Sequence, residues 1–270
     1  MLSRLLPQSR HDFRGAYLEL LKRSLCDLLS PQTFSAVPQD DGTVVAEPLD
    51  GGLLDRRLDG RDWPLNGTTM VGMQRLNAVQ RCIEQIARDR VPGDVIETGV
   101  WRGGTSIFMR AAMRANGLAD RDVWLADSFQ GLPAPDKERY PADVRPEQWA
   151  NLDKFDFLAV SQEEVRAAFE RHGLLDERVR FLPGWFSETL PTMRGRQWSL
   201  LRLDGDMYES TIVALENLYD GLSVGGFVMV DDYGAIPPCK QAVDDFRAER
   251  GIDDEIHTVD WTGAWWRRSR

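Results

Sequence analysis

The sequence predicts an α/β protein with a Rossmann-like sheet, mostly parallel, that ends in an antiparallel hairpin and is preceded by N-terminal helices. Two observations support this fold. From residue 94 onward, short apolar runs alternate with helical patterns, as in strand–helix–strand units. The runs are apolar throughout, which is typical of parallel strands buried on both faces.

The N-terminal part is predicted to be helical, with a loop between two helices. Leucines recur at helical spacing over residues 12–29, and Ser30 and Pro31 end that helix. Residues 38–66 are polar, rich in Gly and Asp and without periodicity, so we expect a long functional loop or flap. Residues 73–86 form the second helix, with Met73, Leu76, Val79, Ile83 and Ile86 on one face.

The strands and helices of the sheet then follow in alternation. Predicted strands lie at 94–97, 123–126, 179–182, 200–203 and 227–230, and predicted helices begin at Thr105, Ser161, Ser210 and after Pro238. Ser161 and Glu164 match a capping box, which marks the start of that helix. Residues 255–259 and 263–267 form the terminal antiparallel hairpin.

Composition excludes several classes of protein. The chain has 33 Lys and Arg against 43 Asp and Glu, a formal charge of −10, which argues against a nucleic-acid partner. Its three cysteines are far apart, so a disulfide scaffold or zinc cluster is not expected. Charged residues interrupt the N-terminus, and no run reaches the ~20 apolar residues of a membrane helix. We therefore expect a cytoplasmic protein with no membrane partner.

Candidate ligand-binding residues follow the first three strands. Glu97, Gly99 and the Gly103-Gly104 pair form a turn whose following helix offers free amides, although a plain strand-to-helix turn is the alternative. Asp127 follows the second strand and could accept hydrogen bonds from a ribose, or cap a turn. After the third strand, Gly184, Trp185 and Phe186 could enclose an adenine or be core aromatics. The G-x-G-x-x-G fingerprint of nicotinamide enzymes is absent.

Acidic residues follow the fourth and fifth strands. The fourth ends at Asp204-Gly205-Asp206 and the fifth at Asp231-Asp232. Neighbouring parallel strands lie about 5 Å apart, so three carboxylates would crowd one volume. Their repulsion is unfavourable unless a proton or cation neutralises it, and oxygen ligands favour Mg²⁺. Capping or solvated carboxylates are the alternative.

In its ordered motifs the chain resembles the macrocin O-methyltransferase family, S-adenosylmethionine-dependent and metal-assisted enzymes that methylate sugar hydroxyls of antibiotics. The motifs are YLELLK at 17–22, TMVGM at 69–73, PGDVIETGVWRGG at 92–104, VWLADSFQG at 123–131, RLDGDMY at 202–208 and GGFVMVDDY at 225–233. The resemblance implies a class I methyltransferase sheet over 91–270, after an N-terminal helical region and flap over 1–90.

The resemblance also implies site residues. S-adenosyl-L-methionine would contact Met70, Glu97, Gly99, Thr105, Ser106, Asp127, Ser128, Gly184, Trp185 and Phe186. Asp204, Asp231 and Asp232 would hold Mg²⁺, and Asp204 is the candidate general base. Residues 132–157 and the flap do not follow the family pattern and are expected to form the pocket for a glycosylated small-molecule acceptor.

Two alternative functions stay open at the level of sequence. A catechol-type, Mg²⁺-dependent O-methyltransferase shares this sheet and a diol site, and a non-catalytic cofactor-binding scaffold would share the cofactor site. A homo-oligomer, dimer or tetramer, is expected because the apolar N-terminal helices suggest subunit contacts, although those helices could equally pack on their own domain.

Overall fold

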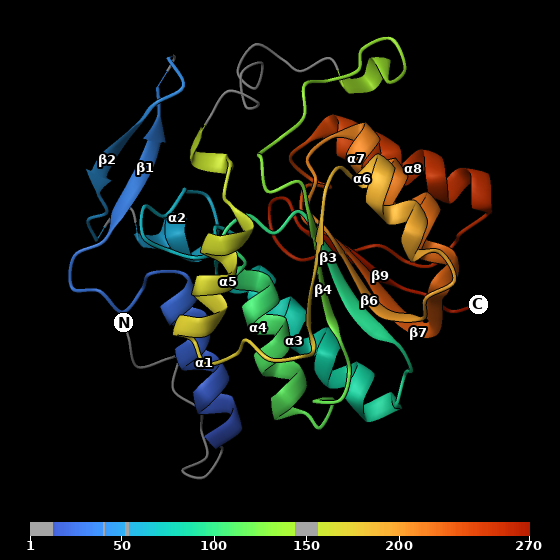
Figure 1. Cartoon of the computed structure of the whole chain (residues 1–270), viewed down its shortest axis with the longest axis horizontal. Coiled ribbons are helices and arrows are strands. Elements are labelled where there is room, and N and C mark those ends of the chain that lie inside the picture. The colour runs from blue at the N-terminus through green and yellow to red at the C-terminus, as the bar shows by residue number, and fades with distance from the viewer. Residues whose placement is uncertain (1–12, 40, 52–53, 144–155) are drawn as a thin grey trace.

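A seven-stranded sheet forms the centre of the protein, in the order β5-β4-β3-β6-β7-β9-β8 (Figure 1). The computed structural model describes residues 13–39, 41–51, 54–143 and 156–270. The strands of the sheet are β3 (Asp94–Thr98), β4 (Val123–Asp127), β5 (Val179–Pro183), β6 (Trp198–Leu203), β7 (Leu222–Val230), β8 (His257–Thr258) and β9 (Ala264–Arg267). The strands from β5 to β7 are parallel, and the terminal β8–β9 hairpin joins β7 antiparallel, which confirms the predicted fold class.

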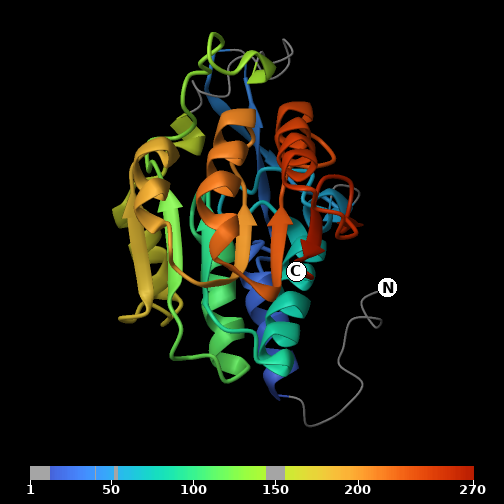
Figure 2. The same ribbon diagram turned by 90° about the vertical axis from the view of Figure 1, so that its right-hand side faces the viewer.

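The sheet reverses its order between β3 and β6. The chain builds β4 and β5 on one side of β3, and then returns to place β6 and β7 on the other side. Open α/β sheets bind ligands at such a reversal, beyond the carboxyl ends of the strands. Figure 2 shows the parallel strands pointing toward the end of the molecule at which the β1–β2 hairpin lies.

Helices cover both faces of the sheet. On one face lie α1, α3, α4 and α5, and on the other lie α6, α7 and α8 (Figure 1). Their bounds are α1 (Phe13–Leu25), α3 (Gly72–Asp89), α4 (Gly104–Ala115), α5 (Gln162–Arg171), α6 (Phe186–Thr189), α7 (Tyr208–Leu218) and α8 (Pro237–Arg250). Because side chains alternate along a strand, Val95 belongs to the core on the first face and Ile96 to the core on the second. Two-sided burial explains why these strands are apolar throughout.

The predicted loop at 38–66 is instead partly regular. An antiparallel hairpin pairs β1 (Phe34–Pro38) with β2 (Val44–Pro48), and α2 (Leu54–Leu58) follows it. Its turn contains Asp41 and Gly42, with Gly42 at φ 86° and the backbone N–H of Thr43 donating to Asp41. An Asp-Gly pair between two short apolar runs is a hairpin signal. The expectation of a loop without regular structure was wrong here. It rested on the polar composition of the segment and gave too little weight to the Asp-Gly signal.

Two predicted helix features are confirmed. Ser161 caps α5, where its hydroxyl accepts the N–H of Glu164 while the Glu164 carboxylate accepts the N–H of Ser161. Leu18, Leu21 and Leu25 of α1 are buried against the core that α3 and α4 share, so this face packs on its own chain.

Residues 144–155 of the predicted acceptor segment 132–157 lie outside the described residues. Within the described ranges, none of the helices has the length and apolarity that crossing a membrane requires.

Candidate active site

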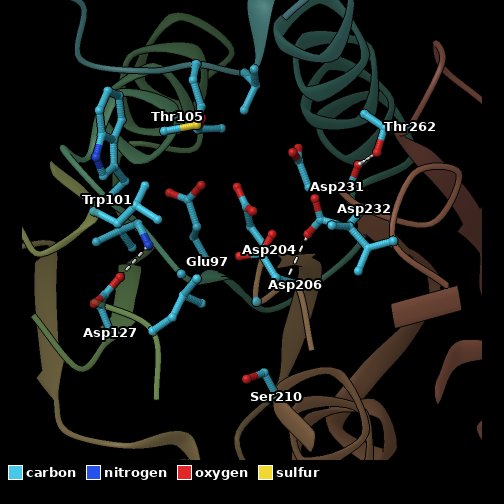
Figure 3. A pocket seen from close by; sticks show the side chains of 18 of the residues that line it. Glu97, Trp101, Thr105, Asp127, Asp204, Asp206, Ser210, Asp231, Asp232 and Thr262 are labelled. Carbon is cyan, nitrogen blue, oxygen red and sulfur yellow. Dashed lines mark hydrogen bonds between the residues drawn. The ribbon is translucent and has the colours of Figure 1, made fainter. Parts of the chain in front are cut away.

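A cavity of about 560 Å³ opens at the carboxyl ends of the parallel strands, where the sheet order reverses. Its walls come from the ends of β3, β4, β6 and β7, from residues 60–63 that follow α2, and from the turn before β9. Figure 3 shows carboxylates from the different strand ends gathered around the cavity. The site is therefore assembled from segments far apart in the sequence.

The turn after β3 forms one wall of the cavity. Gly99 has a φ of 85°, and a Cβ atom there would lie 1.6 Å from the carbonyl oxygen of Asp204, so only glycine fits. Glu97 is fully buried beside it, where it accepts hydrogen bonds from the hydroxyl of Ser106 and from Arg202. The missing side chain of Gly99 thus lets the turn after β3 and the end of β6 come into backbone contact.

Asp127, at the end of β4, holds this turn in place. Its two carboxylate oxygens accept the backbone N–H groups of Val100 and Phe129, each at 2.7 Å. Burial raises the pKa of Asp127, and these amide hydrogen bonds oppose that rise. The neighbouring Ser128 hydroxyl donates to the carbonyl of Gly131 at 2.8 Å. Asp127 therefore holds the turn after β3 in place and also lines the cavity.

Asp204, Asp231 and Asp232 form an acidic cluster on the ends of β6 and β7. One oxygen of each lies within 4.8 Å of the others, as the sequence predicted. The side chain of Asp204 is 28% exposed, whereas Asp231 and Asp232 are buried. Such a set of hard oxygen donors around one point fits a divalent cation of the Mg²⁺ type.

Two buried arginines partly neutralise the cluster. Arg202 donates to Asp204 at 2.8 Å and to one oxygen of Asp231, and Arg75 donates to the other oxygen of Asp231. The backbone N–H of Asp206 donates to Asp232 at 3.3 Å. Two arginines against five carboxylates, Glu97 and Asp206 included, leave a formal surplus of negative charge, which a cation would offset.

The protonation of the cluster reflects this crowding. Burial raises the pKa of Asp204 well above its usual value, the carboxylate of Asp231 raises it further, and Arg202 opposes both. Burial and the carboxylates of Asp206 and Asp204 likewise raise the pKa of Asp232. Burial also raises the pKa of Glu97 to about 7, against the opposing effect of Arg202 and Ser106.

The raised pKa of Glu97 predicts how stability depends on pH. Between pH 4.5 and 7 the unfolded chain releases a proton that the folded protein keeps, so this carboxyl lowers the free energy of unfolding as pH rises. The free energy of unfolding of Glu97→Gln should therefore rise relative to that of the wild type as pH increases across this window. The slope is at most about 1.4 kcal/mol per pH unit for one proton. Urea unfolding of both proteins in chelator at several pH values measures this. A difference that does not change with pH would contradict it.

Most predicted site residues line the cavity, but two do not. Those that do are Met70, Glu97, Gly99, Thr105, Asp127, Ser128, Trp185, Phe186, Asp204, Asp231 and Asp232. Ser106 is fully buried behind Glu97, and Gly184 lies outside the lining, at a φ of 132° where a Cβ atom would meet Thr189. The roles of both in cofactor binding stay predictions.

Sequence reasoning missed several residues of the cavity wall. It also missed Arg202, which lies outside the lining but donates to Asp204 and Asp231. Arg202 carried a signal, because it is a charged residue inside an otherwise apolar strand. The flap and the turn before β9 contribute aromatic residues: Trp63 stacks on Phe157 with ring centroids 5.6 Å apart, and Arg61 lies over Trp261 at 4.5 Å. Trp63 and Trp261 both line the cavity.

Comparison with known proteins finds a matching family model and several similar proteins. Residues 16–268 match the family model described as Macrocin-O-methyltransferase. The chain is 48% identical over 258 residues to the 8-demethyl-8-(2,3-dimethoxy-alpha-L-rhamnosyl)-tetracenomycin-C 4'-O-methyltransferase of Streptomyces olivaceus, over 96% of this chain and 94% of that protein. It is 44% identical over 258 residues to the mycinamicin III 3''-O-methyltransferase of Micromonospora griseorubida, over 94% of this chain and 96% of that protein. The solved structure of the O-methyltransferase NovP matches with a TM-score of 0.83 and 45% identity, over 95% of this chain and 100% of that one.

Proposed function

Because the chain belongs to the macrocin-O-methyltransferase family, a group of S-adenosylmethionine-dependent enzymes, we propose that it methylates a sugar hydroxyl of a glycosylated natural product with the help of Mg²⁺. The observation that carries the proposal is the cluster of Asp204, Asp231 and Asp232 beside the cofactor-side turn, in one cavity. The relatives named for a rhamnosyl tetracenomycin and for mycinamicin III support the class of acceptor.

The cofactor would lie along the wall formed by the ends of β3 and β4. S-adenosylmethionine supplies the methyl group as a sulfonium, and the chain must hold an acceptor oxygen in line with it. Glu97 and Gly99 lie next to Asp204 in that wall, and Asp127 stands at the end of the neighbouring strand. A ribose bound by Asp127 would therefore direct the sulfonium toward the acidic cluster. Correct alignment accounts for a large share of the barrier lowering in such displacements.

Asp204 is suited to accept the acceptor's proton. It is the most exposed member of the cluster, and Arg202 fixes one of its oxygens, which leaves the other free to face the cavity. A bound Mg²⁺ would stabilise the developing negative charge on the hydroxyl oxygen as a Lewis acid. Asp231 and Asp232 are more deeply buried, so their part is to hold the ion.

The acceptor would contact aromatic residues of the cavity wall. Trp63 and Trp261 have large amphipathic rings in that wall, and Arg61 lies over the ring of Trp261. A sugar ring presents both apolar faces and hydroxyl edges, so these side chains suit it.

We expect Asp127→Ala to weaken cofactor binding. The substitution removes the acceptor for ribose hydroxyls and also the ties to Val100 and Phe129 that shape the turn. Hydrogen bonds to a charged group contribute about 1.5–3 kcal/mol each, so affinity for S-adenosylhomocysteine should fall at least about tenfold. Calorimetry measures this, with Mn²⁺ affinity as the control that should not change. An unchanged cofactor affinity would mean that Asp127 only shapes the turn.

The test of the proposed function is a methyl-transfer screen with labelled S-adenosylmethionine. Glycosylated natural products, their aglycones and small catechols are compared, each with Mg²⁺ and with chelator. Transfer to glycosides alone, lost in chelator, supports the proposal. Transfer to catechols alone would favour the catechol-type reaction, and cofactor binding without transfer to any acceptor would favour a non-catalytic scaffold. Full activity in chelator would remove the metal from the mechanism.

A further inference from the structure

Arg75 of α3 is buried at the wall of the cavity, and no role in the reaction has been given to it. Its side chain is 7% exposed, and its guanidinium has three directed hydrogen bonds. It donates to Asp231, to the carboxylate of Asp260 at 3.1 Å and to the carbonyl of Gly60 at 3.1 Å. One side chain thus joins the acidic cluster, the turn before β9 and the flap.

The end of this connection at Asp260 is itself fixed. The side chain of Asp260 is buried, and its second oxygen accepts the backbone N–H groups of Thr262 and Gly263 at 3.0 and 2.8 Å. Thr262 in turn donates its hydroxyl to the backbone carbonyl of Asp231 at 2.9 Å (Figure 3). The turn before β9 therefore holds Asp231 twice, once through its main chain and once through Arg75.

The surrounding backbone leaves room for this arginine only because it carries glycines. A Cβ atom on Gly60 would lie 2.4 Å from a guanidinium nitrogen of Arg75. A Cβ atom on Gly263 would lie 2.9 Å from its Cδ and 3.0 Å from its Cγ. Close packing on two sides restricts the guanidinium to one position, so the carboxylate plane of Asp231 is restricted as well.

We propose that Arg75, anchored by Asp260, is a positioning residue that sets the orientation of Asp231 for metal binding and ties it to the flap; this rests on the proposed metal site. Arg75 uses one oxygen of Asp231 and Arg202 uses the other, and each oxygen keeps a second lone pair for the ion. Partners that orient a metal ligand commonly change metal affinity 10- to 100-fold when they are removed.

Arg75→Lys separates geometry from charge. Lysine keeps the positive charge beside Asp231 but loses the planar fork that reaches Asp231, Asp260 and Gly60 together. Arg110→Lys is the matched control, because Arg110 is also a buried arginine that pairs with a carboxylate, Asp176, and with carbonyl groups, and it does not line the cavity. A purely structural role predicts that both variants lose thermal stability and neither loses metal affinity.

The experiment measures Mn²⁺ binding by the electron paramagnetic resonance of the free ion, with S-adenosylhomocysteine saturating, and cofactor affinity separately. We expect Mn²⁺ to bind Arg75→Lys at least tenfold more weakly than wild type, with Arg110→Lys within twofold and cofactor affinity unchanged in both. Gly263→Ala, which displaces the stem of Arg75 without changing any charge, should weaken Mn²⁺ binding at least threefold. If Arg75→Lys does not fold, the Mn²⁺ affinity of Gly263→Ala tests the positioning role in its place.

Equal or tighter Mn²⁺ binding by Arg75→Lys, or by Gly263→Ala where only that variant folds, would overturn the positioning role while leaving the metal site standing. If wild type itself binds no Mn²⁺ that Asp232→Asn loses, the proposed metal site fails and the role of Arg75 fails with it. The two failures are therefore distinguishable.

Discussion

Asp204→Asn should reduce turnover by about 10²–10⁴-fold, the range typical for the loss of a general base. The amide has nearly the same shape, but it cannot take the proton of the acceptor hydroxyl, and it is a weaker ligand for a cation. Arg202 keeps two other carboxylates as partners, Glu97 and Asp231, so the fold should persist. Initial rates at saturating S-adenosylmethionine and Mg²⁺ measure the effect, with circular dichroism as the check on folding.

Asp206→Asn is the matched control for this substitution. Asp206 lies two residues further on, lines the same cavity and has a φ of 59°, a conformation that asparagine tolerates well. Its main chain, rather than its side chain, makes the hydrogen bond to Asp232. We expect a loss of less than tenfold. Equal losses in the two variants would mean that total negative charge in the cavity matters and that Asp204 has no separate role as a base.

The strands of the sheet could be predicted from local sequence, and the acidic cluster follows from the pairing of adjacent strands. An apolar run such as Leu200-Leu201 can be buried on both sides only as a central strand, and side chains that follow two adjacent parallel strands must meet. Asp204 and Asp231 are thereby brought together by topology alone. The same reasoning placed Asp127 beside the turn after β3, and the structure adds that its oxygens already hold that turn.

Arg75 could not be predicted in the same way. The apolar stripe of its helix is carried by residues such as Leu76 and Val79, and a charged residue beside that stripe is expected to face solvent. It is buried because Asp231 and Asp260, 156 and 185 residues away, compensate its charge. No local sequence pattern indicates partners that are so distant along the chain. The aromatic residues of the cavity wall could not be predicted for the same reason. Trp63 and Trp261 reach the cavity only when the flap and the turn before β9 fold against it.

The arginine pairs also change which aspartate best tests the metal site. Asp231→Asn at first sight relieves repulsion within the cluster and should be tolerated or slightly stabilising. In the structure, however, both oxygens of Asp231 pair with buried arginines, so this substitution also removes one charged partner from Arg75 and one from Arg202. Breaking a buried ion pair from one side is commonly costly. A loss of activity in Asp231→Asn would therefore mix metal loss with local damage.

Asp232→Asn avoids that ambiguity and should give the clearest metal phenotype. Its pKa is raised by burial and by neighbouring carboxylates, so its charge destabilises the metal-free fold at neutral pH. In chelator the variant should therefore melt above wild type. Mg²⁺ should raise the melting temperature of wild type strongly and that of the variant little, because a ligand that binds only the folded state stabilises it more, the more tightly it binds.

Activity should show the same change as a shifted Mg²⁺ requirement. Loss of one charged ligand should raise the half-saturating Mg²⁺ concentration of Asp232→Asn at least about tenfold, by analogy with the loss of a ligand's supporting partner. Excess Mg²⁺ should then restore much of its rate, whereas Asp204→Asn should recover far less, because an added ion cannot accept the proton. Magnesium titrations of rate and of melting temperature for both variants test this together. A wild-type Mg²⁺ curve in Asp232→Asn would remove that residue from the metal site, and equal rescue of both variants would remove the separate role of Asp204 as the base.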